Sequence, residues 1–288
     1  MVNMKQLIVN CYKNVFGTAE YYIRTSNRKS ELFVFAMHGT PLFHRKRLER
    51  LVDELISIYR PISPSDAIRF LNNKEAFQEG PYCLFTFDDG LKNNLLIAEI
   101  LAEKGVSGLF FIVPDFVESS EPERFYRTNI RPEVLPGLEY GPQDLTCMNR
   151  ADLMSLQKSG HTIGCHTSDH LLRYNDTSEK LRLRIIESKN RLEDWSGVAV
   201  EHFASPIDTL FTVNPEAADL IRESYAVHHL TLPGKNDSIP TSMKALYRRN
   251  FEVHWSKGRI RYALGDFDLS RWKKQQNDVY HLLQPRPL

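Results

Sequence analysis

The chain lacks any long apolar run, and its charges nearly cancel. No stretch approaches the roughly 20 apolar residues that a membrane-spanning helix needs. Its 37 Lys and Arg residues face 36 Asp and Glu residues, so no overall field favours nucleic acid or an anionic membrane. We therefore expect neither a transmembrane segment nor a nucleic-acid partner.

Cysteine is also scarce. The chain has four cysteines and no CxxC pair, at Cys11, Cys83, Cys147 and Cys165. A disulfide framework or a structural zinc knuckle is therefore not expected. The N-terminal apolar stretch is interrupted at Asn10 and Lys13, before it reaches the length of a secretory signal. These features predict a cytoplasmic protein.

No internal repeat, low-complexity tract or Gly/Ser-rich linker divides the 288 residues. We therefore predict a single domain over 1–288, with a core at about 32–255. A helix over 1–30 and a tail over 270–288 are expected to be peripheral. The tail is polar after Arg271, and we expect it to be poorly ordered.

Short apolar runs alternate with longer amphipathic segments along the chain. The apolar runs predict strands over 32–37, 82–87, 109–113, 162–164, 202–204 and 225–230. Helices are expected over 48–59, after a cap at Ser65 and Asp66, and over 93–104, 150–159 and 177–194. Repeated strand–helix units predict an α/β fold with a parallel sheet, either closed into a barrel or open. Functional residues are then expected at the carboxyl ends of the strands.

Two adjacent carboxylates, Asp88 and Asp89, follow the strand at 82–87, and Gly90 permits a sharp exit. Two desolvated carboxylates would repel each other unless a cation bound one of them, which leaves the other free as a base. Asp-Gly pairs are also common in simple turns. The segment alone leaves a functional site and a turn equally open.

His166 and His170 follow the strand at 162–164 and are four positions apart. On one helical turn, this spacing presents both imidazoles to the same side. Two histidines with one carboxylate, and a position left for water, are typical of a catalytic zinc site. The pair lies at a strand exit, as Asp88 and Asp89 do, which strengthens both assignments.

The combination resembles the NodB-homology polysaccharide deacetylases, carbohydrate esterase family 4. The first motif of that family is matched by Thr86-Phe87-Asp88-Asp89-Gly90, and the second by His166-Thr167-Ser168-Asp169-His170. Segments 108–113 and 160–164 are similar to the flanking strands of the family. The resemblance implies a distorted, incomplete (β/α) barrel.

The resemblance also implies roles for these residues. Asp88 becomes the general base, and Asp89, His166 and His170 become ligands of a divalent metal, for which Zn²⁺ is expected. A metal of this kind lowers the pKa of water and polarises a carbonyl. The implied activity is N-deacetylation of an N-acetylated sugar in a bacterial surface polysaccharide or its precursor.

The third motif departs from the usual family pattern, which has an Arg that orients the catalytic Asp. Here the segment reads His202-Phe203-Ala204-Ser205-Pro206-Ile207-Asp208-Thr209, which is closer to the FAYPxG form of the poly-N-acetylglucosamine deacetylases. We expect Pro206 to shape a loop over the metal. Asp208 is either a substrate contact or a turn residue. The sequence shows no obvious partner that orients Asp88.

The late Leu-x-His motif that supplies the general acid in the family is also not evident. His38 is the preferred candidate, because Phe35-Ala36-Met37-His38 resembles the Met-Tyr-His opening of the same subgroup. His228, His229 and His254 are interpreted as strand residues. For each of them a role as core or surface histidine is favoured.

The remaining charged and sulfur-containing groups have simpler interpretations. The run 179–194 is expected to be a solvated helix face, and Cys165 is expected to pack behind the histidine loop. Two rival functions remain, an amidohydrolase acting on a small non-sugar amide and a glycan-binding barrel without activity. The presence of Asp88 argues against the second rival, because a pure binder needs no base beside its metal. The oligomeric state is left open.

Overall fold

The computed structural model describes residues 30–130, 141–206, 213–266 and 269–284. Its centre is a parallel sheet with the order β1-β8-β7-β6-β5-β4-β3-β2. The strands are β1 (Leu32–Met37), β2 (Arg60–Pro61), β3 (Tyr82–Phe87), β4 (Gly108–Ile112), β5 (Thr162–Cys165), β6 (His202–Ala204), β7 (Val227–Leu230) and β8 (Ala245–Asn250).

The sheet closes because β1 pairs with β3 as well as with β8. Leu32 is in register with Tyr82 and Met37 with Phe87, while Val34 is in register with Arg248. The two-residue strand β2 pairs only with the start of β3 and lies outside this ring. The expected distorted (β/α) barrel is therefore confirmed, and its ring contains seven strands rather than eight among the described residues.

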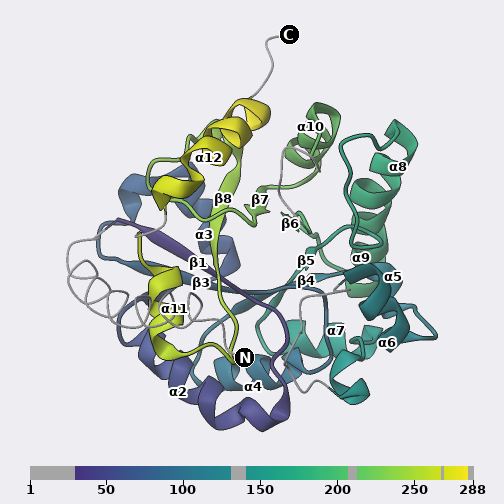
Figure 1. Cartoon of the computed structure of the whole chain (residues 1–288), viewed down its shortest axis with the longest axis horizontal. Helices are drawn as coiled ribbons and strands as arrows, with labels where there is room; N and C mark the ends of the chain where they lie inside the picture. Colours follow the sequence, from purple (N-terminus) through teal and green to yellow (C-terminus); the bar gives the residue numbers. More distant parts are fainter. Residues whose placement is uncertain (1–29, 131–140, 207–212, 267–268, 285–288) are drawn as a thin grey trace, which may run out of the picture.

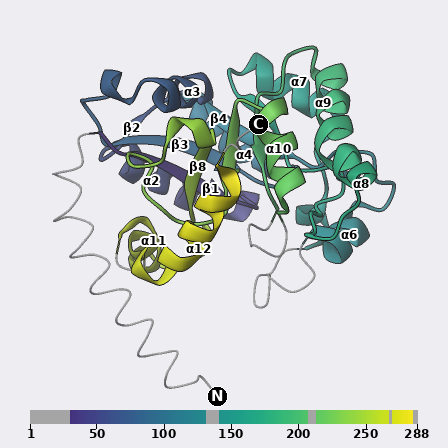
Figure 2. The same cartoon turned by 90° about the horizontal axis from the view of Figure 1, so that it is seen from above.

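Helices surround the ring (Figure 1). Figure 2 shows α2 and α11 on one side of the barrel and α8 and α9 on the opposite side. The α-helices are α2 (Arg45–Ile56), α3 (Pro64–Asn72), α4 (Asn94–Glu103), α5 (Pro114–Val117), α6 (Pro122–Phe125), α7 (Arg150–Lys158), α8 (Ser178–Arg182), α9 (Ser188–Ser196), α10 (Pro215–Ser224), α11 (Lys257–Leu264) and α12 (Leu269–Leu283). Shorter helical turns are η1 (Leu42–His44), η2 (Lys74–Ala76), η3 (Tyr126–Ile130), η4 (Pro142–Leu145), η5 (Leu183–Glu187) and η6 (Thr241–Met243).

The core lies inside the ring and between the ring and its helices. Every residue of β1, β3 and β4 is buried, which explains why these strands are continuous apolar runs rather than alternating ones. Aromatic rings join neighbouring strands, with the centroids of Phe35 and Phe85 5.4 Å apart. This packing fixes the strand ends that carry the polar residues.

Two helix predictions need correction. The cap of α3 is Ser63, whose Oγ accepts from the Asp66 amide, rather than Ser65 and Asp66 themselves. Pro64 explains this start, because it occupies the first helical position, where no amide donor is needed. The predicted helix 177–194 consists of α8, the π-type turn η5 and α9.

Two predictions near the C-terminus are also wrong. His254 lies in a turn after β8, not in a strand, because the strand ends at Asn250. The polar tail forms α12, which buries Val279 and Leu283, and Trp272 packs against the core. Trp272, Val279 and Leu283 are seven and four positions apart, so they share one helical face, and the burial of this face outweighs the polar composition between them.

The expected helix over 1–30 lies almost entirely outside the described residues. No helix in the described ranges is both long enough and apolar enough to cross a membrane.

Candidate active site

Parallel strand pairing brings the two motifs to the same end of the barrel. The Asp88 amide donates to the Met37 carbonyl at 2.9 Å and so extends the pairing of β3 with β1. The His166 amide donates to the Ile112 carbonyl at 2.9 Å and extends the pairing of β5 with β4. Asp88 and His166 therefore each donate the backbone hydrogen bond that directly follows their strand, which fixes their positions.

The Asp-Asp-Gly segment turns sharply, as the sequence predicts. Asp89 and Gly90 both have a positive φ, 77° and 79°. A Cβ at Gly90 would lie 3.3 Å from Ile112 Cδ1 in addition to this strained conformation. Glycine is therefore required here, whereas Asp tolerates the left-handed region better than most residues do.

Asp89, His166 and His170 form one buried cluster whose candidate ligand atoms all lie within 4.8 Å of one another. Asp89 Oδ1 is 3.4 Å from His170 Nε2 and 3.7 Å from His166 Nε2. Two ligands of a tetrahedral zinc ion are separated by roughly 3.4 Å, given bond lengths near 2.1 Å. The spacing therefore fits a single small divalent cation.

The outer ring nitrogens of both histidines face backbone carbonyls. His166 Nδ1 lies 2.8 Å from the Ala204 carbonyl at the end of β6, and His170 Nδ1 lies 3.3 Å from the Asn129 carbonyl. A carbonyl oxygen can only accept, so each Nδ1 carries the proton and each Nε2 presents its lone pair to the cluster. This is the tautomer that a metal ligand needs.

Burial, followed by the opposing effect of Asp88, sets the protonation of His166. Burial lowers the pKa of His166 and the Asp88 carboxylate raises it. The net pKa is about 4, so the ring is neutral at physiological pH. The donor set of one carboxylate and two imidazoles fits a catalytic metal centre. These three residues could hold a divalent cation.

The histidine loop is not helical, which corrects the interpretation of the i, i+4 spacing. Residues 166–170 form an irregular loop in which Thr167 and His170 have positive φ values of 64° and 60°. The centroids of the His166 and His170 rings are 5.0 Å apart. The shape of this loop, and not the spacing of a helix, brings the two rings together.

A buried arginine from η5 holds the loop in shape. Arg184 donates to both oxygens of Asp169, the residue before His170, with its Nε at 3.0 Å from Oδ1 and its Nη2 at 2.9 Å from Oδ2. It also donates to Asp176 at 2.5 Å. Arg184 thus corrects the prediction that the run 179–194 is a solvated face, because its side chain is only 9% exposed.

Arg248 of β8 is the partner of Asp88 that the sequence analysis did not identify. Its Nη1 donates to Asp88 Oδ1 at 2.6 Å, and its Nε donates to the Leu230 carbonyl at 3.1 Å. Burial alone would raise the pKa of Asp88, but the charge of Arg248 and the hydrogen bond that it donates lower this pKa below its usual value. The available signal was a pair of adjacent arginines, Arg248 and Arg249, in the buried strand Ala245–Asn250.

The second oxygen of Asp88 lies between two imidazoles. Oδ2 is 3.8 Å from His166 Nε2 and 4.0 Å from His38 Nε2. His38 Nδ1 in turn lies 2.6 Å from Glu252 Oε1, just after β8. The side chains of His38 and Glu252 are 19% and 14% exposed, so solvent reaches the site from their side.

The segment Tyr126–Ile130 supports the cluster from outside the two motifs. The Tyr126 hydroxyl donates to Asp89 Oδ2 at 3.3 Å, and Asn129 supplies the carbonyl that faces His170. Nothing in the sequence pattern of this segment predicts either contact. Pro206 is half-buried in a bend after β6, and Asp208 lies outside the described residues.

The remaining candidates are structural. His228 and His229 are both buried in β7, where His228 Nε2 contacts Ser205 Oγ at 2.7 Å and His229 Nε2 contacts His202 Nδ1 at 3.0 Å. Cys165 packs behind the loop, with its Sγ 3.1 Å from Ser188 Oγ, as expected.

Comparisons with known proteins agree with this geometry. Residues 77–219 match the family model of the polysaccharide deacetylases, and this range includes both motifs. No curated protein matches the chain.

Several solved structures share the fold. IcaB from Ammonifex degensii is 17% identical with a TM-score of 0.59, covering 82% of this chain and 98% of that one. The deacetylase PplD of Streptococcus pyogenes, solved with acetate, is 13% identical with a TM-score of 0.60, covering 81% and 97%. A polysaccharide deacetylase from Bacillus cereus is 15% identical with a TM-score of 0.59, covering 81% and 69%.

The matched range includes the buried Asp/His/His cluster, the adjacent Asp88 and the strands that carry them. This chain belongs to the polysaccharide deacetylase family, whose members are hydrolases that cleave the amide bonds of acetylated sugars.

Proposed function

We propose that this protein is a metal-dependent N-deacetylase that converts an N-acetylated sugar into acetate and a free amine. The observation that carries the proposal is the position of Asp88 Oδ2, which is 3.8 Å from His166 Nε2 on the metal side and 4.0 Å from His38 Nε2 on the other. The two nitrogens flank a carboxylate oxygen at the place where water and an acetyl group would meet.

Asp89, His166 and His170 would hold the cation, for which we propose Zn²⁺. When bound, such an ion lowers the pKa of a water molecule and polarises the acetyl carbonyl. The nitrogen and oxygen donors suit zinc better than magnesium or calcium, which prefer oxygen ligands alone.

Asp88 acts as the general base. Arg248 occupies Oδ1 and so directs Oδ2 toward the site. The ionised carboxylate accepts a proton from the attacking water at Oδ2, and general-base assistance of this kind contributes roughly 10²–10⁴-fold to the rate.

His38 acts as the general acid. Glu252 fixes its Nδ1 at 2.6 Å, so its Nε2 faces the site. A proton donated from Nε2 to the leaving nitrogen allows the C–N bond to break and releases the sugar amine. The pairing with Glu252 stabilises the protonated ring in which His38 begins this step.

We propose an N-acetylhexosamine as the substrate, within a bacterial surface polysaccharide or its precursor. The support is family membership, together with fold similarity to IcaB over 98% of that chain. We also propose that Pro206 lies beside the substrate. It lies just after β6, and the Ala204 carbonyl of β6 contacts His166.

The test combines metal analysis with acetate release. Purified full-length protein should carry one zinc per chain, and it should release acetate from oligomers of N-acetylglucosamine after zinc is restored to a chelated sample. If acetate is released only from small non-sugar amides, the substrate is a small amide and not an N-acetylated sugar. Absence of acetate from every amide would reject the activity.

Asp88→Asn separates the base from the metal ligands. The variant should keep its zinc and lose turnover by at least about 100-fold, because only the proton acceptor has been removed. Asp89→Asn is the matched comparison on the neighbouring residue and should lose zinc. Loss of zinc from the Asp88 variant would contradict the assignment of these two residues.

A further inference from the structure

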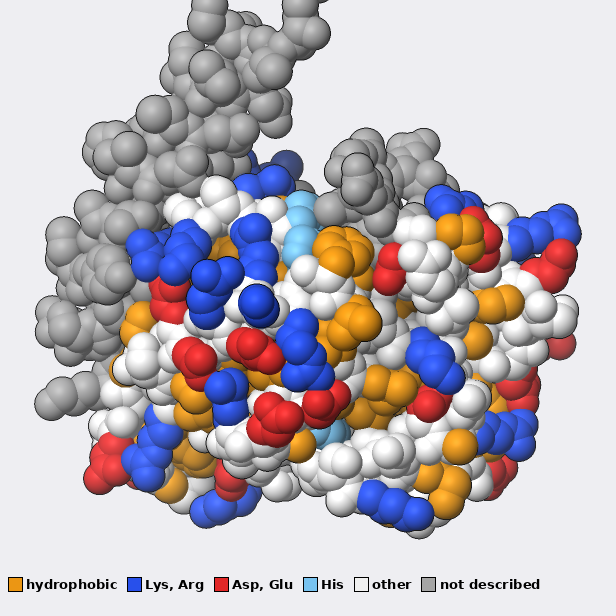
Figure 3. Space-filling view, turned by 90° about the horizontal axis from the view of Figure 1, so that it is seen from below, with side chains coloured by type: hydrophobic (Ala, Val, Ile, Leu, Met, Phe, Trp, Pro, Cys, Tyr) orange, Lys and Arg blue, Asp and Glu red, His pale blue; other side chains and the backbone are white. Residues whose placement is uncertain are grey.

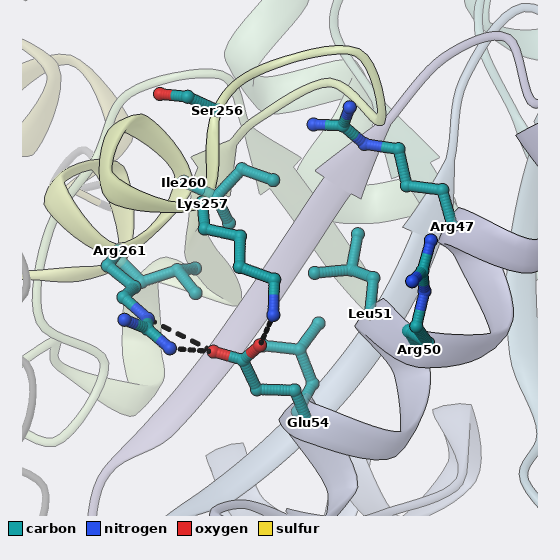
Figure 4. A pocket seen from close by; sticks show the side chains of 10 residues that line it. Arg47, Arg50, Leu51, Glu54, Ser256, Lys257, Ile260 and Arg261 are labelled. Atoms are coloured by element: carbon teal, nitrogen blue, oxygen red, sulfur yellow. Dashed lines mark hydrogen bonds and ion pairs between the residues drawn. The ribbon is translucent and has the colours of Figure 1, made fainter. Parts of the chain in front are cut away.

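A pocket lies between α2 and α11, apart from the metal-ligand cluster. It has a volume of about 340 Å³, and none of its lining residues belongs to the Asp/His site. Figure 4 shows that the two helices face each other across it with side chains pointing in from both. The established family chemistry assigns no role to this pocket.

The pocket is amphipathic. Its apolar part consists of one side chain row from each helix, Leu51 and Leu55 from α2 with Ile260 and Leu264 from α11. Four basic side chains surround this row, namely Arg47, Arg50, Lys257 and Arg261. A ligand that fills it must therefore combine negative charge with apolar groups.

The basic groups fall into two sets with different partners. Glu54 neutralises one set, because its carboxylate is 2.6 Å from Arg261 Nη2 and 3.3 Å from Lys257 Nζ. Among the described residues, Arg47 and Arg50 have no carboxylate within ion-pair distance. Arg50 donates only to the Lys46 carbonyl, and Arg47 donates to the Trp255 carbonyl.

The surroundings of Arg47 disfavour its charge. Burial and then the neighbouring Arg50 lower the pKa of Arg47 below its usual value. An anion seated between the two guanidinium groups would remove this repulsion, and phosphate oxygens match the planar guanidinium well. Figure 4 shows the Arg50 side chain beside α2, whereas the Arg47 side chain extends from α2 toward the loop before α11.

The chain next to α2 exposes large apolar side chains. Leu42 and Phe43 of η1, immediately before α2, are 72% and 60% exposed. Figure 3 shows Lys and Arg side chains gathered on the left part of the face seen from below, where α2 and α11 lie. Exposed aromatic and aliphatic groups beside a basic cluster are the combination found in proteins that bind the surface of an anionic bilayer.

We propose that the surface formed by η1, α2 and α11 docks onto an anionic phospholipid bilayer. The pocket accepts the phosphate of one lipid headgroup between Arg47 and Arg50, and Leu42 and Phe43 enter the interfacial layer. The net charge of the whole chain, +1, does not indicate this surface, because the surface results from local clustering of basic residues. A free anion would make no use of the exposed Leu42 and Phe43.

The proposal is tested by sedimentation of the full chain with vesicles. We expect binding to phosphatidylcholine vesicles that contain 30% phosphatidylglycerol, and at least tenfold weaker binding to pure phosphatidylcholine. Arg47→Gln combined with Arg50→Gln should weaken binding to the anionic vesicles at least tenfold, since each basic residue near such a surface contributes about a fivefold factor.

Matched variants control for general charge and hydrophobicity. Arg45→Gln removes one charge from the same helix, but Arg45 is paired with Glu99 at 2.7 Å and does not line the pocket. Leu42→Ser with Phe43→Ser is compared with Leu183→Ser, which removes a 53% exposed leucine from η5 on the opposite side of the barrel. We expect weak effects from the two controls.

Three outcomes would overturn the proposal. These are equal binding to neutral and anionic vesicles, no loss of binding in the Arg47/Arg50 variant, and equal losses in the Arg45 control and the Arg50→Gln single variant. The melting temperature of every variant is measured to confirm folding, and Arg50 is exposed, so its replacement is not expected to affect the fold. Deacetylation of soluble oligosaccharides is measured separately, so failure of the docking proposal leaves the enzymatic proposal untouched.

Discussion

Arg248 and Asp88 form a buried ion pair across the barrel, with Nη1 2.6 Å from Oδ1 and side chains that are 0% and 3% exposed. The two residues lie on different strands, β8 and the exit of β3, which are separated by β1 in the closed ring. In the proposed mechanism, Arg248 orients the Asp88 carboxylate, which is the task of the Arg that the third motif lacks. Arg248 is therefore a positioning residue, because it acts through Asp88.

Arg248→Gln should lower kcat by roughly 100-fold, because a misplaced base loses its alignment with the attacking water. It should also cost about 3–5 kcal/mol of unfolding free energy, because it leaves Asp88 buried without its cation. Steady-state kinetics and denaturant unfolding on the same sample measure both effects. Arg249→Gln is the matched control, because Arg249 is buried on the same strand but pairs with Asp266 at 3.0 Å. An equal loss of kcat in both variants would assign only a structural role to Arg248.

Glu252 is expected to act only through His38, which it contacts at 2.6 Å. Glu252→Gln should lower kcat about tenfold without changing KM, and His38→Gln should lower it about 100-fold while zinc stays bound. In the His38→Gln background, the Glu252 change should have no further effect on kcat. Additive effects of the two changes would show that Glu252 acts independently of His38.

Arg184 should control metal affinity, although it contacts no metal ligand directly. It fixes Asp169, which precedes His170, so Arg184→Gln should weaken zinc binding by about 10–100-fold. Competition with a chelator at fixed pH measures this affinity without any assay of activity. Arg191→Gln is the control, since Arg191 joins Asp115 and Glu118 near the same helices. If the zinc affinity of the Arg184 variant is unchanged, the contact between Arg184 and Asp169 does not contribute to metal binding.

His202 should make the fold sensitive to acid. Burial lowers its pKa to about 4, whereas the unfolded chain binds this proton near pH 6.5. The unfolded state therefore holds more protons between these values, so stability is full above pH 6.5 and falls as the pH drops toward 4. The expected contribution is about 3 kcal/mol.

His202→Gln tests this dependence. The variant keeps a group that can hydrogen-bond to His229, and its unfolding free energy should decline less steeply between pH 6.5 and 4 than that of the original chain. Between pH 7 and 8 the two proteins should show the same slope. If the unfolding free energies of the two proteins decline in parallel throughout the acidic range, His202 does not take up a proton on unfolding.

The sequence by itself determined the strand–helix alternation and the Asp/His motifs, because both are local. Hydrophobic patterning identified the buried strands except β8, and Asp88 and His166 directly follow two of those strands, so strand position located both residues. The resemblance to the family then predicted the cluster of Asp89, His166 and His170, and the structure brings these residues together as predicted.

Only the tertiary structure decided how these residues are held. Arg248 reaches Asp88 from 160 positions away, Glu252 reaches His38 from 214, and both contacts exist because β1 closes the ring between β8 and β3. The loop that carries His166 and His170 takes its shape from Arg184 and from two carbonyls on distant segments. Local periodicity carries no information about such pairings, because they depend on strand order and register around a closed barrel.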